Sequence, residues 1–407
     1  MPRPVAADRR YCCCRRTFSR RSASSRNRTE RTRPRRTLLP RTWRGSPRPL
    51  RDDYGRITVI AGDEVARAGA RGELAELAHV LGARIAVTPD AKDVLDPAAP
   101  GRLGITGAMG NPDVIDALRD CDLCLLVGTR LPVMARGGLD AALEKTLVYS
   151  VGSATPYVQA RHVPTRDLRA TLRRLVTEIG PPASPVPLVP GDPTLIDVPR
   201  PDTSGMRYTD AVTALAAAMP DGADVFADAG NTGAAVVHHL PVSTGGRFVV
   251  ALGMGGMGYT FGAAIGSAFS RGRRTFVIAG DGAFYAHGLE IHTAVEYAVP
   301  VTFVVFNNNA HAMCLTREQV YFEGAYTYSR FRPARIAAGV GALLPGLPCH
   351  TVDTTADLAH ALRSTAASTG PAVIEVVCDA DELPPFLPFL PARGAAQKTE
   401  TREGARR

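Results

Sequence analysis

The sequence TFVIAGDG (residues 275–282) decides the fold of its part of the chain. A short, largely apolar run, typical of a buried strand, leads directly into a Gly-Asp-Gly turn. The pattern returns as VTFVVFNNN (301–309), where an apolar run ends in three asparagines. In an open α/β sheet, ligands bind beyond the carboxyl ends of the strands. The two runs therefore predict that a carboxylate and a carboxamide converge at one sheet edge.

Asp281 and Asn308 form a pair that suits a hard divalent cation. Mg²⁺ prefers about six oxygen ligands and commonly takes some of them from phosphate and water. Asp281 offers a carboxylate oxygen, Asn308 an amide oxygen and Ala310 a backbone carbonyl. These three residues are the candidate metal ligands.

The glycines on either side of Asp281 indicate that the second ligand is an anion. Gly280 and Gly282 have no Cβ, so a diphosphate can approach the backbone closely. A helix expected to begin near His287 would direct unpaired N–H groups toward the same anion. Alone, a Gly-Asp-Gly turn is common, and only its spacing to the asparagines makes it informative.

Outward from these motifs, strand and helix patterns alternate in two stretches, which predicts an α/β fold with two Rossmann-like parallel-sheet domains. Apolar strands are expected at 56–62, 84–89, 123–128, 146–151, 224–228, 247–252, 275–279, 301–306, 350–353 and 373–378. Helices are expected at 66–81, 166–179, 258–269, 289–297 and 355–367. The predicted parts are a disordered Arg-rich tail (1–54), a central α/β domain (55–181), a Pro-rich linker (182–204), a ligand-binding domain (205–392) and a polar tail (393–407).

The charge of the chain is concentrated at its start. The whole sequence has a formal charge of +9. Residues 1–50 hold 16 arginines and two acids, a net of +14, so the remainder is at −5. Only the tail could neutralise phosphates, and the rest gives no reason to expect a nucleic-acid binder.

Cysteine usage makes a reducing cytoplasm the simplest compartment. The eight cysteines do not form a disulfide framework. Cys121 and Cys124 form a C-x-x-C, which we interpret as packing where a helix end runs into a buried strand rather than as a zinc or redox site. No run of 18 uninterrupted apolar residues is present, which excludes a transmembrane helix.

Three ordered motifs resemble one family. The Gly-Asp-Gly turn with its distant asparagines resembles the signature of thiamine diphosphate (ThDP) enzymes. Upstream, GMGGMGY (253–259) and DAGNT (228–232) look like segments of acetolactate synthase-like and pyruvate decarboxylase-like enzymes. Residues 56–130 look like their Rossmann-like central domain. The resemblance extends over roughly residues 55–390.

The resemblance implies a role for each matching residue. Asp281, Asn308 and the Ala310 carbonyl would hold Mg²⁺. Met257 would be the bulky residue beneath the cofactor, although plain core packing is its alternative, and the Gly255 carbonyl would accept a bond from the aminopyrimidine. The residues that would line the diphosphate are Gly230, Asn231, Thr232, Gly280, Gly282 and Ala283.

The implied reaction is ThDP- and Mg²⁺-dependent decarboxylation or carboligation of a 2-oxo acid, pyruvate being the best guess. Candidate proton-transfer residues are His311, His287 and Glu290, each of which has a purely structural alternative. Met313 and Cys314 would line the substrate space. No convincing FAD-contacting segment is found, so FAD is not assigned.

Family members carry a further domain that binds the aminopyrimidine and supplies a glutamate. Before the central domain this sequence offers only Glu30. We therefore expect either a partner that supplies the pyrimidine domain, with a homo-oligomer implied by the family, or a truncated product with impaired catalysis. A regulatory ThDP-binding subunit is the alternative function.

Overall fold

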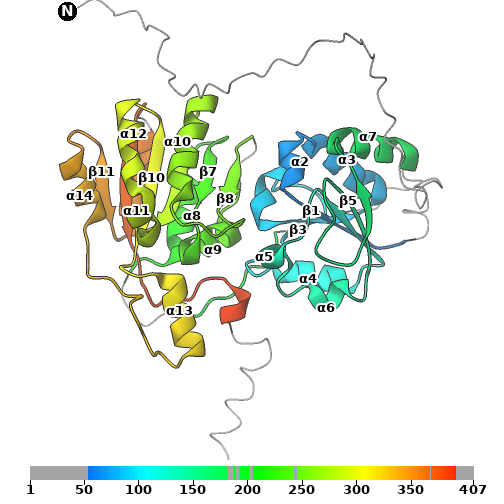
Figure 1. Cartoon of the computed structure of the whole chain (residues 1–407). Coiled ribbons are helices and arrows are strands. Elements are labelled where there is room, and N and C mark those ends of the chain that lie inside the picture. The colour runs from blue at the N-terminus through cyan, green and yellow to red at the C-terminus, as the bar shows by residue number, and fades with distance from the viewer. Residues whose placement is uncertain are drawn as a thin grey trace, which may run out of the picture. The chain divides into compact units, whose positions relative to one another are not determined.

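The computed structural model describes residues 54–181, 188, 192–200, 205–242, 245–366 and 368–390. They form two α/β domains, each built on a six-stranded parallel sheet (Figure 1). The predicted fold class is confirmed. The predicted tails (1–54 except its last residue, and 393–407) and much of the predicted linker lie outside the described residues.

The first sheet has the strand order β3-β2-β1-β4-β5-β6. Its middle strands β1 and β4 are buried along their whole length, as expected where helices cover both faces of a parallel sheet. Its strands are β1 (Ile57–Ala61), β2 (Arg84–Val87), β3 (Arg102–Ile105), β4 (Leu123–Val127), β5 (Leu147–Gly152) and β6 (Arg161–Pro164). Its helices are α2 (Asp63–Arg67), α3 (Arg71–Leu81), η2 (Pro89–Val94), α4 (Pro112–Arg119), α5 (Val133–Arg136), α6 (Asp140–Leu143) and α7 (Leu168–Ile179).

The second sheet has the strand order β11-β12-β10-β9-β7-β8. Its strands are β7 (Asp224–Ala227), β8 (Phe248–Val250), β9 (Thr275–Gly280), β10 (Val301–Asn307), β11 (Cys349–Val352) and β12 (Ala372–Val377). Its helices are α8 (Tyr208–Ala218), α9 (Gly230–His239), α10 (Tyr259–Arg271), α11 (Asp281–His287), η3 (Gly288–Glu290), α12 (Ile291–Glu296), α13 (Ala312–Tyr321), α14 (Ile336–Leu343), α15 (Thr355–Ala366) and η4 (Leu387–Phe389).

An aromatic cluster fixes α10 against the second sheet. Phe261 of α10 is fully buried. Its ring stacks on Phe303 of β10, with 5.8 Å between ring centroids, and meets Phe284 of α11 edge-on at 6.4 Å. These contacts bury large apolar areas, so Phe261 is a principal core residue of this domain.

Both sheets reverse their strand order, and beside that point the first is tightly packed at Gly62 while the second has a cavity. In the first sheet the reversal lies between β1 and β4. A Cβ on Gly62 there would lie 2.4 Å from the Thr129 Cβ and 2.6 Å from the Gly128 carbonyl oxygen. In the second sheet the chain passes from β7 to β8 on one side and returns to β9 on the other. The loops that follow β7, β9 and β10 line a cavity, at the place where doubly wound sheets bind ligands.

The structure adds helices that were not among the predicted ranges, such as α8 and α9, and differs from the predicted elements at three further places. The expected helix 66–81 is two helices, because the chain turns at Gly69 with φ +60°. The edge strands β3 and β6 were not predicted. The helix expected near His287 instead begins at Asp281 and ends at His287, because the chain turns helical immediately after Gly280.

The C-x-x-C pair lies where the sequence indicated. Cys124 is buried within β4, and Cys121 donates to the Leu118 carbonyl at 3.3 Å. Both thiols are free. Burial raises the pKa of each thiol, which favours the neutral thiol over a metal-binding thiolate. Among the described residues no helix is long and apolar enough to cross a membrane.

Candidate functional site

The candidate site is a cavity of about 330 Å³ in the second domain. Three chain segments at the carboxyl ends of neighbouring strands form most of its wall: the start of α9 after β7, the start of α11 after β9, and the loop after β10. Its lining residues are Tyr208, Ala229, Gly230, Asn231, Thr232, Met257, Gly280, Asp281, Gly282, Ala283, Asn308, Ala310, His311, Ala312, Met313 and Cys314.

Strand register brings the candidate metal ligands together. Phe306 pairs with Gly280 in the parallel β9–β10 ladder, so the residues that follow on each strand emerge side by side. The Ala310 backbone N–H donates to both Asp281 Oδ2 (3.2 Å) and Asn308 Oδ1 (3.0 Å). A carboxylate oxygen and an amide oxygen therefore converge on one point, and such oxygens are the ligands that Mg²⁺ prefers.

The environment of Asp281 favours a nearby cation. The side chain is only 2% exposed, and burial raises its pKa to about 6. Backbone N–H groups, including those of Gly282 (2.7 Å) and Ala310, oppose that shift by stabilising the carboxylate. A cation bound at this oxygen would compensate the buried negative charge.

One buried polar atom of the cavity has no partner among the described residues. Asn231 is 2% exposed, and its Nδ2 donates to Thr316 Oγ1 at 3.1 Å while its Oδ1 has no partner. A half-turn of the amide lets the Thr316 hydroxyl donate to Oδ1 and makes Nδ2 the end without a protein partner. In that orientation Asn231 is a hydrogen-bond donor for an anionic oxygen, which fits a diphosphate.

Two glycines keep the cavity open. Gly230 has φ +92°, and no atom lies within 4 Å of the position that its Cβ would occupy. A Cβ on Gly282 would lie 2.7 Å from His311 Nδ1 and 3.9 Å from Met257 Sδ. The absence of a side chain there allows the imidazole and the thioether to approach the Asp281 loop. The His311 ring packs edge-on against Phe331, with 4.5 Å between centroids.

Most of the predicted site residues line this cavity, but three do not. The His287 ring lies against Gly258, where a Cβ would be 2.6 Å from its Cδ2. Glu290 is exposed and accepts a hydrogen bond from Thr293. Gly255 is exposed, with φ +63°. The start of α11, from Asp281 to Ala283, lines the cavity. His287 is the last residue of this helix and Glu290 follows it, so neither lines the cavity.

Tyr208 is the lining residue that the sequence did not indicate. It is the first residue of α8, is 1% exposed, and accepts a hydrogen bond from Asn308 Nδ2 at 2.6 Å. A single tyrosine about 100 residues from the asparagine run belongs to no motif. Its contribution comes from tertiary structure alone.

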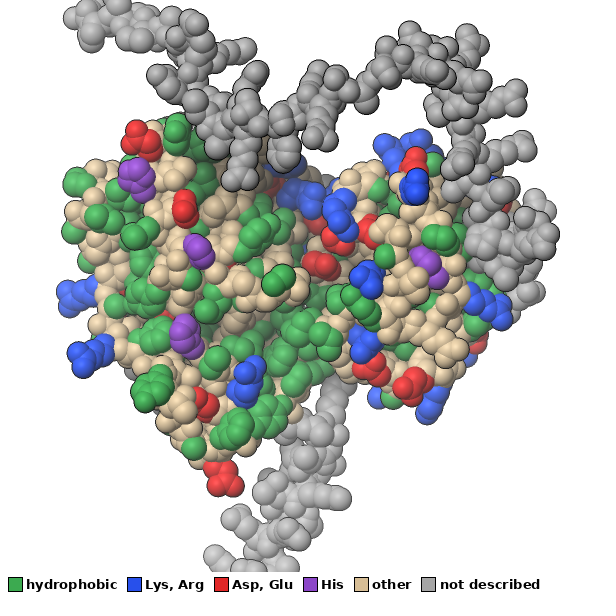
Figure 2. Space-filling view, in the orientation of Figure 1, with side chains coloured by type: hydrophobic (Ala, Val, Ile, Leu, Met, Phe, Trp, Pro, Cys, Tyr) green, Lys and Arg blue, Asp and Glu red, His purple; other side chains and the backbone are tan. Residues whose placement is uncertain are grey.

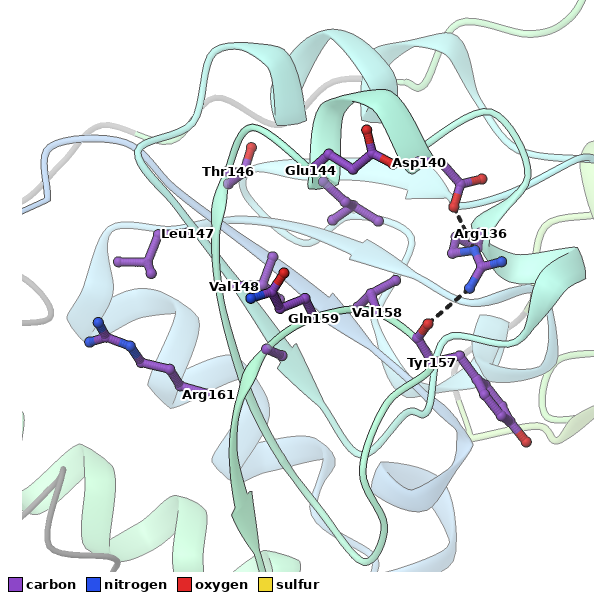
Figure 3. A pocket seen from close by; sticks show the side chains of 12 residues that line it. Arg136, Asp140, Glu144, Thr146, Leu147, Val148, Tyr157, Val158, Gln159 and Arg161 are labelled. Atoms are coloured by element: carbon purple, nitrogen blue, oxygen red, sulfur yellow. Dashed lines mark hydrogen bonds and ion pairs between the residues drawn. The ribbon is translucent and has the colours of Figure 1, made fainter.

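A larger cavity, about 690 Å³, lies in the first domain beside the amino ends of β5 and β6 (Figure 3). Arg136 pairs with Asp140 at 2.7 Å and donates to the Tyr157 carbonyl at 3.1 Å. This cavity lies at the opposite end of the strands from the edge where parallel sheets bind ligands. Because of this position, its larger volume does not make it the better site.

The second domain exposes many large apolar side chains near the cavity. Met254 is 98% exposed and Tyr328 94% exposed. Figure 2 shows hydrophobic side chains over the face of this domain that is turned to the viewer. Others come from α10, α11, η3 and α13: Tyr259, Tyr285, Leu289 and Tyr321. Exposed apolar side chains mark an interaction site where they form a contiguous patch.

Comparisons with known proteins agree with this geometry. Residues 53–174 match the central domain of thiamine pyrophosphate enzymes, and residues 228–376 match their C-terminal TPP-binding domain. The chain is 27% identical to the acetolactate synthase isozyme 1 large subunit of Escherichia coli over 354 residues, 84% of this chain and 61% of that protein. It is 23% identical to the pyruvate decarboxylase of Neurospora crassa over 339 residues, 80% of this chain and 57% of that protein.

A solved structure shares the fold. Benzoylformate decarboxylase from Polynucleobacter necessarius superposes with a TM-score of 0.69 at 18% identity, covering 89% of this chain and 69% of that one. The chain spans about 60% of the length of the curated relatives named above.

Proposed function

This chain belongs to the thiamine pyrophosphate enzyme family, and from that premise we propose that it binds ThDP with Mg²⁺ and acts on a 2-oxo acid as a decarboxylase or carboligase. The observation that carries the proposal is the convergence of Asp281 Oδ2 and Asn308 Oδ1 on one backbone N–H. It lies at the carboxyl ends of β9 and β10, beside the reversal of strand order between β7 and β9, and this edge is where the fold class binds ligands.

The proposed metal ligands are Asp281, Asn308 and the Ala310 carbonyl. The described N–H groups donate no hydrogen bond to that carbonyl oxygen, so it is free to bind a cation. The diphosphate would lie against glycine-lined backbone and the Asn231 amide, and Met257 would support the rings. The residues proposed for the diphosphate are Gly230, Asn231, Thr232, Gly280, Gly282 and Ala283.

ThDP, when bound, supplies a nucleophilic carbon and an electron sink for decarboxylation. The chain's own residues position and enclose that chemistry. Apolar lining from Ala312, Met313 and Cys314 excludes water from the reacting groups. His311 presents Nδ1 to the space above Gly282, and an imidazole there can hold and return a proton. We restrict the catalytic proposal to His311, since His287 and Glu290 lie outside the cavity.

We further propose that a second copy of this chain covers the exposed apolar side chains beside the cavity; a separate pyrimidine-binding partner is the alternative. Met254 and Tyr259 flank Met257, and all three are largely exposed. Burying such surface stabilises association by about 25 cal/mol per Å² of apolar area before the costs of binding. Sedimentation velocity on the full chain would test this, and a concentration-independent monomer would contradict it. A cytoplasmic location remains a proposal based on cysteine usage.

Calorimetric titration with ThDP, with and without Mg²⁺, tests the cofactor. The wild type is expected to bind ThDP only with Mg²⁺. Asp281→Ala leaves the diphosphate charge poorly compensated, and we expect a loss of about 3 kcal/mol, roughly a hundredfold. Asp353→Ala, a change of an exposed aspartate after β11, is the matched control. Binding that ignores both Mg²⁺ and Asp281→Ala would refute the proposed site.

Pyruvate consumption, measured on the same preparations, tests the reaction. Turnover that requires ThDP and Mg²⁺ supports the enzyme. Cofactor binding without turnover of pyruvate or other 2-oxo acids would favour the regulatory-subunit alternative.

A further inference from the structure

We infer that Tyr208 is a positioning residue for the metal site, because its phenol oxygen fixes the Asn308 carboxamide with Oδ1 directed toward Asp281. The inference rests on the proposed function, since it concerns the metal ligand set named above. It assigns a task to a side chain that no motif of the sequence indicates.

The hydrogen bonds of Asn308 define which end of its amide is which. The Ala310 backbone N–H can only donate, so the end of the amide that it faces must be the oxygen, at 3.0 Å. The nitrogen is then at the opposite end, 2.6 Å from Tyr208 Oη. Nδ2 needs an acceptor, and the phenol oxygen is that acceptor.

The metal site depends on this orientation. The N–H that fixes Asn308 Oδ1 also donates to Asp281 Oδ2 at 3.2 Å. If the amide turned over, an NH₂ group would face the carboxylate where a cation needs an oxygen. Asn308 is 8% exposed, so an Nδ2 without an acceptor would be a buried donor that water cannot readily satisfy.

Two contacts beside the Asn308 hydrogen bond hold Tyr208 in place. Its ring stacks on Phe306, with 5.9 Å between centroids and 14° between planes. Its backbone N–H donates to Glu382 Oε2 at 2.7 Å. The phenol oxygen is therefore a fixed acceptor supplied by the start of α8.

The experiment measures the Mg²⁺ concentration that gives half-maximal ThDP binding, by calorimetry on the full chain. Tyr208→Phe keeps the ring and its stacking but removes the acceptor. We expect it to raise the half-maximal Mg²⁺ concentration by about fivefold, the size of one hydrogen bond. Tyr149→Phe is the matched control, since it removes a hydroxyl that accepts from Arg161 at 2.8 Å in the first domain, and it should change nothing.

A second background separates positioning from packing. Asn308→Asp has an oxygen at both ends of the side chain, so a ligand oxygen faces the metal without an orienting acceptor. Tyr208→Phe should then change the Mg²⁺ requirement by less than about twofold. An equal loss in both backgrounds, or no loss in the wild-type background, would overturn the inference alone. Failure of the wild type to bind ThDP with Mg²⁺ would overturn the proposed function and this inference with it.

Discussion

Asp228 is expected to hold the glycine-rich loop that carries Met257. The carboxylate is fully buried after β7. Its oxygens accept from Gly258 N at 3.1 and 3.0 Å, from Thr260 Oγ1 at 2.5 Å and from Ala229 N at 2.9 Å. Gly258 directly follows Met257, so the carboxylate ties this loop to the sheet edge.

Asp228→Asn removes more than a charge. The amide has one acceptor oxygen, so the Gly258 N–H, which donates to both carboxylate oxygens, keeps only one acceptor. The Ala229 N–H donates to Oδ1 alone and the Thr260 N–H to Oδ2 alone, so one of these two buried donors faces the NH₂ group and loses its partner. An unsatisfied buried donor costs about 1–3 kcal/mol, and the charge-assisted bonds weaken as well. We expect the free energy of unfolding to fall by about 2–4 kcal/mol.

Urea unfolding of Asp228→Asn and of Thr260→Val measures this effect. Thr260→Val removes only the hydroxyl donor and should cost about 1 kcal/mol. ThDP affinity should fall further in Asp228→Asn, because Met257 loses its support. If Asp228→Asn proved no more destabilising than Thr260→Val, the carboxylate would not be the anchor of the loop.

Three further changes have defined outcomes. Gly282→Ala forces His311 to move, because the new Cβ would lie 2.7 Å from its imidazole. Gly280→Ala is the control, since its Cβ meets nothing closer than 3.5 Å. Urea unfolding should show that the free energy of unfolding falls by about 1–2 kcal/mol for Gly282→Ala only. Burial raises the pKa of Glu382 to about 7 from its ordinary 4.5, so the folded protein holds a proton that the unfolded chain releases. The contribution of Glu382 to stability should therefore fall by about 3 kcal/mol as pH rises from roughly 4.5 to 7, measured as the difference between the wild type and Glu382→Gln in unfolding at several pH values. Phe261→Ala should lower the free energy of unfolding by about 3–5 kcal/mol, which thermal unfolding shows as a strong drop in melting temperature. Phe269→Ala, at a site 54% exposed, should have little effect.

The sheets were predictable because a parallel sheet covered on both faces needs strands that are apolar throughout. β1 and β10 are such runs, and every one of their residues is buried. The edge strand β6 has an exposed residue at each end, one of them a proline. An edge strand needs less apolar surface and tolerates proline, so its sequence does not differ from that of a loop.

The candidate metal ligands were predictable for a different reason. Parallel pairing puts the ends of β9 and β10 side by side, with Phe306 opposite Gly280. Any polar residues placed immediately after both strands must then meet. Helix starts are less constrained, since α11 begins at Asp281 itself and not near His287. A short helix can begin directly at a strand end without the helical spacing of apolar residues that would predict it.

Tyr208 shows where such reasoning ends. Its neighbour Asn308 is 100 residues away in sequence, and the contact between them depends on how α8 packs beside β10. No local sequence pattern, such as apolar periodicity, a helix cap or a turn, predicts a contact between residues so far apart in sequence. The loops at strand ends supply the ligand atoms, and their positions follow from topology. The orientation of those atoms depends on side chains brought from other elements, so a sequence motif can identify the ligands of this site while leaving their positioning residues unseen.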